Sequence, residues 1–145
     1  MILVLPIKLP DGSEPTLSLH PLQHPSRFSL HDNVLWFDLP RGASVHLLSG
    51  DNPDLSLPDP QPSASLPPAT TCRAHWSAML HGGQAELWCF EYDQHQRLTH
   101  WTADIHQGHQ QHRWKTHANH RSLRLSLQLR GAGHLWIEKI ICSEA

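Results

Sequence analysis

The sequence has no long apolar run, little net charge and almost no helical periodicity. No window approaches the ~20 consecutive apolar residues of a membrane helix, so no membrane segment is predicted. The 11 basic residues do not outnumber the 13 acidic ones, and the arginines are scattered. A nucleic-acid-binding protein normally carries a basic stripe, so that class is not expected. Met1–Pro6 lacks the basic lead and long apolar stretch of a signal peptide, which weakly favours a cytoplasmic location and leaves the localisation open.

Cysteine is also scarce and shows no metal-ligand or redox spacing. Cys72, Cys89 and Cys142 form an odd set without a CxxC pair, and each lies in an apolar, strand-like segment. We expect buried free thiols, with one disulfide and a leftover thiol as the alternative.

The residues that replace the missing apolar and charged ones are typical of strands and irregular loops. The chain of 145 residues contains 14 histidines and 12 prolines, and its length suits one domain spanning residues 1–145. Apolar runs and alternating segments predict strands. They cover Ile2–Leu5, Thr16–Leu19, Arg27–Leu30, Val34–Leu39, Ala43–Leu48, Cys72–Leu80, Ala85–Asp93, Arg97–Thr102, Arg113–Thr116, Ser122–Arg130 and His134–Cys142.

Between the two halves lies a proline-rich segment, Ser49–Thr71, with six of the twelve prolines. Proline donates no ladder hydrogen bond, so we expect a long surface loop. A second loop, rich in histidine and glutamine, is expected before Arg113.

Two strands in the carboxy-terminal half have the clearest patterns. In Ser122–Arg130 four leucines alternate with polar residues, which predicts one buried and one solvent-facing side. Ala85–Asp93 is apolar on both sides, which is typical of a strand covered twice, or covered once and bound to a ligand. The many short strands predict an all-β, two-sheet antiparallel β-sandwich of jelly-roll topology.

Three stretches resemble the jelly-roll carbohydrate-binding modules of the galactose-binding-like group of sandwiches. Arg73–Leu98 is similar to their paired central strands, and Trp114–Thr116 to their tryptophan-bearing strand. Ser122–Ile140, with its leucine ladder, Gly131-Ala132-Gly133 turn and Leu-Trp-Ile-Glu-Lys-Ile ending, is similar to their closing hairpin. The resemblance covers about the last seventy residues.

The resemblance implies a module that binds a glycan, or assists a glycan-modifying protein, without catalysing a reaction. In many such modules the acidic residue at the position of Glu138 lies beside a structural calcium ion; no other cofactor is expected. A change of parity between Ile137 and Ile140 predicts a β-bulge near Glu138.

Tryptophan faces that stack on sugar rings, with polar neighbours for the hydroxyls, are the candidate binding groups. Trp36, Trp76 and Trp136 are assigned to the core, whereas Trp101 and Trp114 flank a polar loop and are expected to be more exposed. In the family the tryptophan at the Trp114 position often seals the core edge. The full set of candidate ligand-binding residues is Arg73, His75, Trp88, Tyr92, Trp101, Trp114, Arg124 and Gln128.

The polar members of this set form a patch only if their strands are neighbours. Arg73 and His75 share one side of a strand, and Arg124 and Gln128 share one side of another. If both strands belong to one sheet, the four side chains suit sugar hydroxyls or a carboxylate. An ordinary solvated face is the alternative.

Two other functions stay open. A β-sandwich for protein contact or homo-oligomerisation would place Ala85–Asp93 at its interface. A metal-dependent jelly-roll enzyme would need a ligand set, and His106, His109 and His112 are spaced by three, as on one helix face. Their glutamine- and glycine-rich surroundings favour a loop instead. No His-x-His pair, Gly-x-Ser-x-Gly elbow or phosphate loop is present, so catalysis is not expected.

Overall fold

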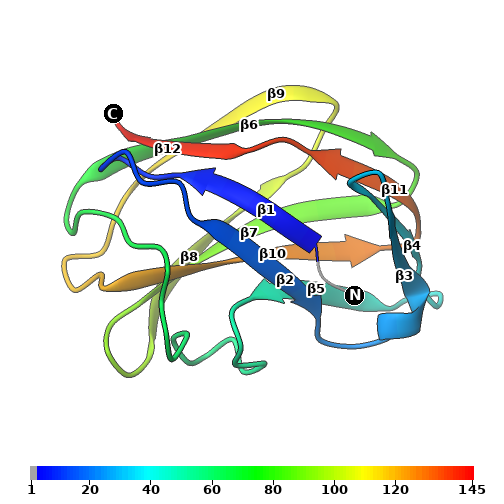
Figure 1. Ribbon diagram of the computed structural model, residues 1–145, viewed down its shortest axis with the longest axis horizontal. Coiled ribbons are helices and arrows are strands. Elements are labelled where there is room, and N and C mark those ends of the chain that lie inside the picture. The colour runs from blue at the N-terminus through cyan, green and yellow to red at the C-terminus, as the bar shows by residue number, and fades with distance from the viewer. Residues whose placement is uncertain (1–2) are drawn as a thin grey trace.

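The computed structural model describes residues 3–145, and these fold as an antiparallel β-sandwich of jelly-roll type, which confirms the expected fold class. The two layers lie one above the other in Figure 1. Sheet A has the order β1 (Leu3–Lys8), β2 (Thr16–Pro21), β5 (Ser44–Ser49), β10 (Ser122–Arg130), β7 (Gln84–Tyr92) and β8 (Arg97–Asp104).

In sheet B, β3 (Phe28–His31) pairs with β4 (Val34–Asp38), and β4 pairs with β11 (Ala132–Ile137). Strands β11 and β12 (Ile140–Glu144) pair in succession with one edge of β6 (Thr71–His81), and β9 (Gly108–Lys115) pairs with its other edge. A 3-10 turn, η1 (Pro25–Arg27), precedes β3. Strand β1 pairs with β2 in sheet A and, in parallel, with β12 in sheet B, so it joins the two sheets along one side. Ile2, the first residue of the first expected strand, lies outside the described residues.

The core lies between the sheets and is built by strand alternation. The four leucines of β10, from Leu123 to Leu129, point inward and are at most 3% exposed. They meet inward-facing residues of sheet B such as Trp76 and Leu135, which are also buried. All three cysteines are free and buried, as expected.

Two glycine turns connect the central strands at the positions expected from the sequence. Gly82 and Gly83 have φ values of 72° and 65°, the left-handed conformation that glycine adopts readily, and they join β6 of sheet B to β7 of sheet A. Gly131, with φ of 76°, joins β10 to β11. Each turn therefore carries the chain from one sheet to the other.

The predicted β-bulge near Glu138 is confirmed by the pairing with β6. Ile137 lies opposite Ala78, whereas Ile141 lies opposite His75, so β11 and β12 contain one residue more than the facing part of β6. The Glu138 side chain is exposed at this bulge, and its backbone N–H donates to the Ser77 carbonyl over 2.9 Å.

The histidine- and glutamine-rich segment was wrongly expected to be a loop. Residues 108–115 form the edge strand β9, which pairs with β6 over eight positions. Its inward residues, Gln110, His112 and Trp114, are only half-buried at the sandwich edge. The sequence of this strand therefore lacks the clear alternation of apolar and polar residues by which strands are recognised. A strand also places His109 and His112 on opposite sides, which removes the shared face that their spacing suggested.

Candidate functional site

The outer side of sheet A gathers aromatic and polar side chains around Trp88. In β7, Leu87 and Cys89 point into the core, so Trp88 and Phe90 point outward. The register places Trp88 opposite Ser126 of β10 and Thr102 of β8. The sequence pattern predicted that Trp88 and Phe90 share one side of the strand, but it could not predict which residues of β8 and β10 lie beside them.

One half of this side is covered by the chain's own proline-rich loop. Arg124 is 1% exposed, and its guanidinium donates to the carbonyls of Ser49 (2.8 Å), Asp54 (3.0 Å) and Leu57 (2.9 Å), and to that of Asn52. The expectation that Arg124 faces solvent was therefore wrong, because a buried guanidinium requires acceptors and the loop carbonyls provide them.

Tyr92 lies under the same loop and is likewise unavailable to a ligand. It is fully buried, and its hydroxyl donates to the Leu55 carbonyl over 2.6 Å. Burial raises its pKa to about 12, so the phenol stays protonated. Phe90 and Tyr92 pack with Leu48, Leu22 and Leu55 in a second apolar cluster. The two-sided pattern of Ala85–Asp93 therefore comes from the loop and does not require a second copy of the chain.

The other half remains open, and we call it the Trp88 face: His46, Glu86, Trp88, His100, Thr102, Asp104 and Gln128. The rings of Trp88 and His100 stack with centroids 5.2 Å apart and planes at 16°. His46 meets the Trp88 ring edge-on at 5.1 Å. The indole is thus held between two imidazoles, which restricts its rotation and leaves it half-buried.

Polar groups flank the indole in defined positions. Gln128 Nε2 donates to His46 Nε2 over 3.4 Å, and His46 Nδ1 donates to Ser126 Oγ over 2.7 Å. Burial lowers the pKa of His46, so its ring is uncharged at neutral pH. Glu86 lies opposite both Gln128 and Asp104 in the register. The Trp88 face therefore offers an aromatic plane, an amide and two carboxylates.

Trp88 and Gln128 are the predicted residues that the structure brings to this face. His46, Glu86, His100, Thr102 and Asp104 were not predicted. Strand alternation places Glu86 on the same outward side of β7 as Trp88, so the sequence pattern could have predicted Glu86. The other four come from β5 and β8, and only the strand pairing shows that they are neighbours.

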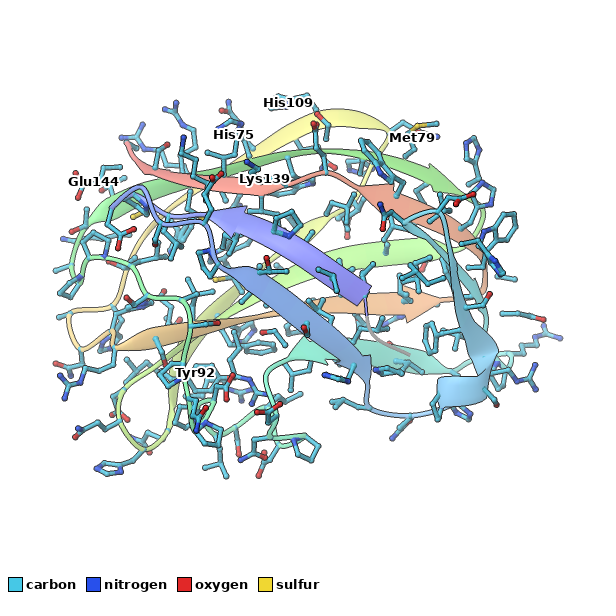
Figure 2. The ribbon with its side chains drawn as sticks, in the orientation of Figure 1. His75, Met79, Tyr92, His109, Lys139 and Glu144 are labelled. Atoms are coloured by element: carbon cyan, nitrogen blue, oxygen red, sulfur yellow. The ribbon has the colours of Figure 1, made fainter. Side chains whose placement is uncertain are left out.

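Arg73 and His75 lie on the other side of the molecule. They point outward from β6 in sheet B, whereas Gln128 belongs to β10 in sheet A, so the condition for a patch shared by the four polar residues is not met. Arg73 faces Arg113 across the β6–β9 ladder, and His75 meets His109 edge-on at 5.5 Å. Figure 2 shows His75, His109 and Met79 projecting from the upper layer, far from Tyr92.

Trp101 and Trp114 close the gap between the sheets, where β8 and β9 form the edges opposite β1. Their ring centroids are 4.9 Å apart, and His112 stacks on Trp101 at 4.1 Å. Both indole N–H groups are buried. Both side chains are half-buried rather than fully exposed, because they seal the two edge strands against water; for Trp114 this is the core-edge position that the sequence analysis gave as the alternative.

Trp36 is more exposed than the sequence predicted. It was assigned to the core from its apolar run, yet it is 45% exposed on the outer side of sheet B. Its neighbours Leu35 and Phe37 are the residues that point inward. Trp76 is 2% exposed, as expected for the core, and Trp136 is half-buried.

A buried carboxylate–imidazole pair is the nearest approach to catalytic geometry. His120 Nδ1 donates to Glu91 Oε1 over 2.8 Å, and both side chains are at most 1% exposed. His120 Nε2 accepts from the Leu66 N–H over 2.9 Å, and Glu91 Oε1 also accepts from the His117 N–H. Both ring nitrogens are thus engaged, so the pair fastens two loops to the sheet.

Neither a metal cluster nor a membrane helix is found in residues 3–145. No three His, Cys, Asp or Glu side chains of this part stand close enough to hold a metal ion together. No helix within it has the length and apolar character needed to cross a bilayer.

Comparison with known proteins gives a structural neighbour and no sequence relative. No protein-family model matches the chain. No curated protein matches it in sequence. A solved structure described as "CBM4 structure and function" aligns with 85% of this chain and 90% of that one, with a TM-score of 0.45 and 10% sequence identity.

Proposed function

We propose that the protein is a non-catalytic carbohydrate-binding domain whose glycan lies along the Trp88 face. The observation that carries the proposal is the half-buried indole of Trp88, held between His46 and His100 on the open part of sheet A. The apolar face of a pyranose ring packs on such a plane, since both surfaces are flat and poorly hydrated.

The polar groups beside the indole match the needs of sugar hydroxyls. Gln128 can donate and accept, the carboxylates of Glu86 and Asp104 accept, and the uncharged His46 ring joins the same network. His46, Gln128, Glu86 and Asp104 lie opposite one another in a single row across β5, β10, β7 and β8, and this row is two residues along β7 from Trp88. A row across four strands is long enough for more than one sugar unit, since neighbouring strands lie ~4.8 Å apart.

The experiment is a glycan array followed by isothermal titration with a bound glycan. We expect Trp88→Ala to weaken binding at least tenfold, which corresponds to about 1.4 kcal/mol. Trp88→Phe keeps an aromatic plane and should retain part of the affinity. Met79→Ala, which removes a 51% exposed side chain from sheet B, is the matched control and should bind like the unmodified protein.

Two results would contradict the proposal. One is the absence of any glycan bound above background by the folded protein. The other is a Trp88→Ala variant that keeps its thermal unfolding transition and binds with unchanged affinity.

The Trp88 face also limits how the protein can associate with a glycan-modifying protein. The binding domain would hold the polymer while the partner acts on it, so the Trp88 face must stay accessible in the complex.

A further inference from the structure

Trp36 is an exposed aromatic residue that the Trp88 face does not use. It lies on the outer side of sheet B, whereas the Trp88 face lies on the outer side of sheet A, so the two indoles are on opposite sides of the sandwich. Tryptophan is on average among the highly buried residue types. With 45% of its surface exposed, Trp36 therefore presents a large apolar plane to solvent.

The Trp36 ring is held in place by a row of histidines. The register sets Trp36 of β4 opposite His134 of β11, and His134 opposite His81 of β6. The Trp36 and His134 rings stack with centroids 4.2 Å apart and planes at 27°, and His134 and His81 follow at 4.8 Å and 30°. One face of the indole is thus occupied and fixed by His134.

The opposite side of Trp36 borders a hollow of about 370 Å³ beside β3. Its polar lining comes from Ser26, Arg27, Ser29 and Asp38, all of them exposed, above the buried rings of Phe28 and Phe37. The two ion pairs within residues 3–145 lie elsewhere, so the guanidinium of Arg27 and the carboxylate of Asp38 keep their hydrogen-bonding capacity. The volume is near the lower end of the ~300–1,000 Å³ range of small-molecule sites.

We propose that this hollow is a second carbohydrate site, which takes one terminal sugar ring stacked on the free side of Trp36. The two serine hydroxyls and Arg27 supply donors, and Asp38 supplies an acceptor for the ring hydroxyls. The mixture of opposite charges and hydroxyls suits a neutral sugar. The inference rests on the proposed function, and it adds that the protein binds two glycan chains, one on each sheet.

A protein with two such sites on opposite sides can link glycan chains together. Binding at one site raises the local concentration of polymer near the other, so affinity for a long polysaccharide exceeds the affinity of either site alone. Loss of either site should abolish cross-linking while leaving binding at the other.

The test uses native gels that each contain one soluble polysaccharide: a glucan, a xylan, a mannan or a galactan. Light scattering of protein mixed with the retarding polysaccharide measures cross-linking. The variants are Trp36→Ala, Trp88→Ala and the double variant, with Met79→Ala as the control on the same side of sheet B. Arg27→Ala and Asp38→Ala change only exposed side chains of the hollow, so they test the site even if Trp36→Ala fails to fold.

We expect each tryptophan variant to lose cross-linking and to show retardation weakened at least threefold, and the double variant to migrate as in a plain gel. Arg27→Ala and Asp38→Ala should behave like Trp36→Ala, and Met79→Ala like the unmodified protein. If only Trp88→Ala changes binding, the second site is refuted and the proposed function stands. If only Trp36→Ala changes binding, the hollow beside Trp36 is a glycan site, but the Trp88 face is refuted and with it the claim that the protein binds two glycan chains.

Two further outcomes would overturn the inference. Absence of retardation in all four gels would refute both sites. A shift of the free protein from dimer to monomer on Trp36→Ala, seen by size-exclusion chromatography with light scattering, would mean that a second copy of the chain covers Trp36.

Discussion

Arg124 shows how one buried charge organises a loop that has no secondary structure of its own. Residues 50–70 contain no strand, yet three loop residues and the end of β5 turn carbonyls toward a single guanidinium. Arginine suits this role because its planar fork offers five donors and stays charged even where burial lowers its pKa. Leu55 then covers Phe90 and Tyr92.

Replacing this residue should therefore release the loop. We expect Arg124→Met to lower the free energy of unfolding by about 3 kcal/mol, since each buried acceptor left without a donor costs about 1–3 kcal/mol and loop opening relieves part of it. Urea denaturation measures the loss, and limited proteolysis within residues 50–62 reports the opening. Arg130→Met, at an exposed position of the same strand, is the control and should change stability little. Equal stability of the two variants would show that the carbonyl contacts are unimportant.

At the scale of elements, the turn that leads from β6 in one sheet to β7 in the other depends on a glycine for two separate reasons. Gly83 has φ of 65°, and a Cβ atom there would lie 2.7 Å from the Arg130 carbonyl oxygen and 2.6 Å from the Phe37 ring. Gly42 also has positive φ, 81°, but a Cβ atom there would meet nothing within 4 Å. Alanine at Gly42 would therefore introduce backbone strain alone, whereas alanine at Gly83 would introduce both strain and steric overlap.

We expect Gly42→Ala to lower the free energy of unfolding by about 1 kcal/mol, the cost of the left-handed conformation for a residue with Cβ. Gly83→Ala should cost at least about 2 kcal/mol more, since backbone of the β10–β11 turn must also move. Thermal and urea unfolding of both variants provide the comparison. Equal losses would mean that the turn shifts freely and that overlap contributes nothing.

At the scale of the whole molecule, two histidines whose pKa is lowered by burial make stability depend on pH. Burial lowers the pKa of His46 and of His112 in the folded state. The unfolded chain therefore binds protons at these positions first as pH falls, so stability is highest above about pH 6.5, the ordinary histidine value, and decreases below it. The two histidines act at different places, His46 on the Trp88 face and His112 at the edge sealed by Trp101.

The melting temperature should therefore fall between pH 7.5 and pH 5.5, and it should fall less in His46→Gln. His95→Gln, at an exposed position, is the control and should follow the unmodified protein. A His46→Gln variant with the same pH dependence as the unmodified protein would exclude His46 as a contributor. The range stops at pH 5.5 so that the carboxylates with lowered pKa, such as Asp93, do not titrate.

Local pattern was enough to predict the fold class and several elements, because strand alternation and glycine turns are encoded within a few residues. The buried leucine side of β10, the Gly82-Gly83 turn and the bulge at Glu138 are examples, whereas the solvent-facing side expected for β10 is mostly buried. The same pattern predicted that Trp88 and Gln128 are candidates on outward positions of their strands, and the structure places them on one face.

Only the tertiary structure decided which outward positions stay open. Arg124, Tyr92 and Gln128 all occupy outward positions of their strands. A loop from another part of the chain buries Arg124 and Tyr92, whereas Gln128 stays half-exposed. Trp36 is more exposed than its apolar run predicted and Trp101 is only half-exposed, because exposure depends on which sheet or edge lies opposite. Alternation determines the side of a strand on which a residue lies; contacts between residues distant in the chain determine what covers that side.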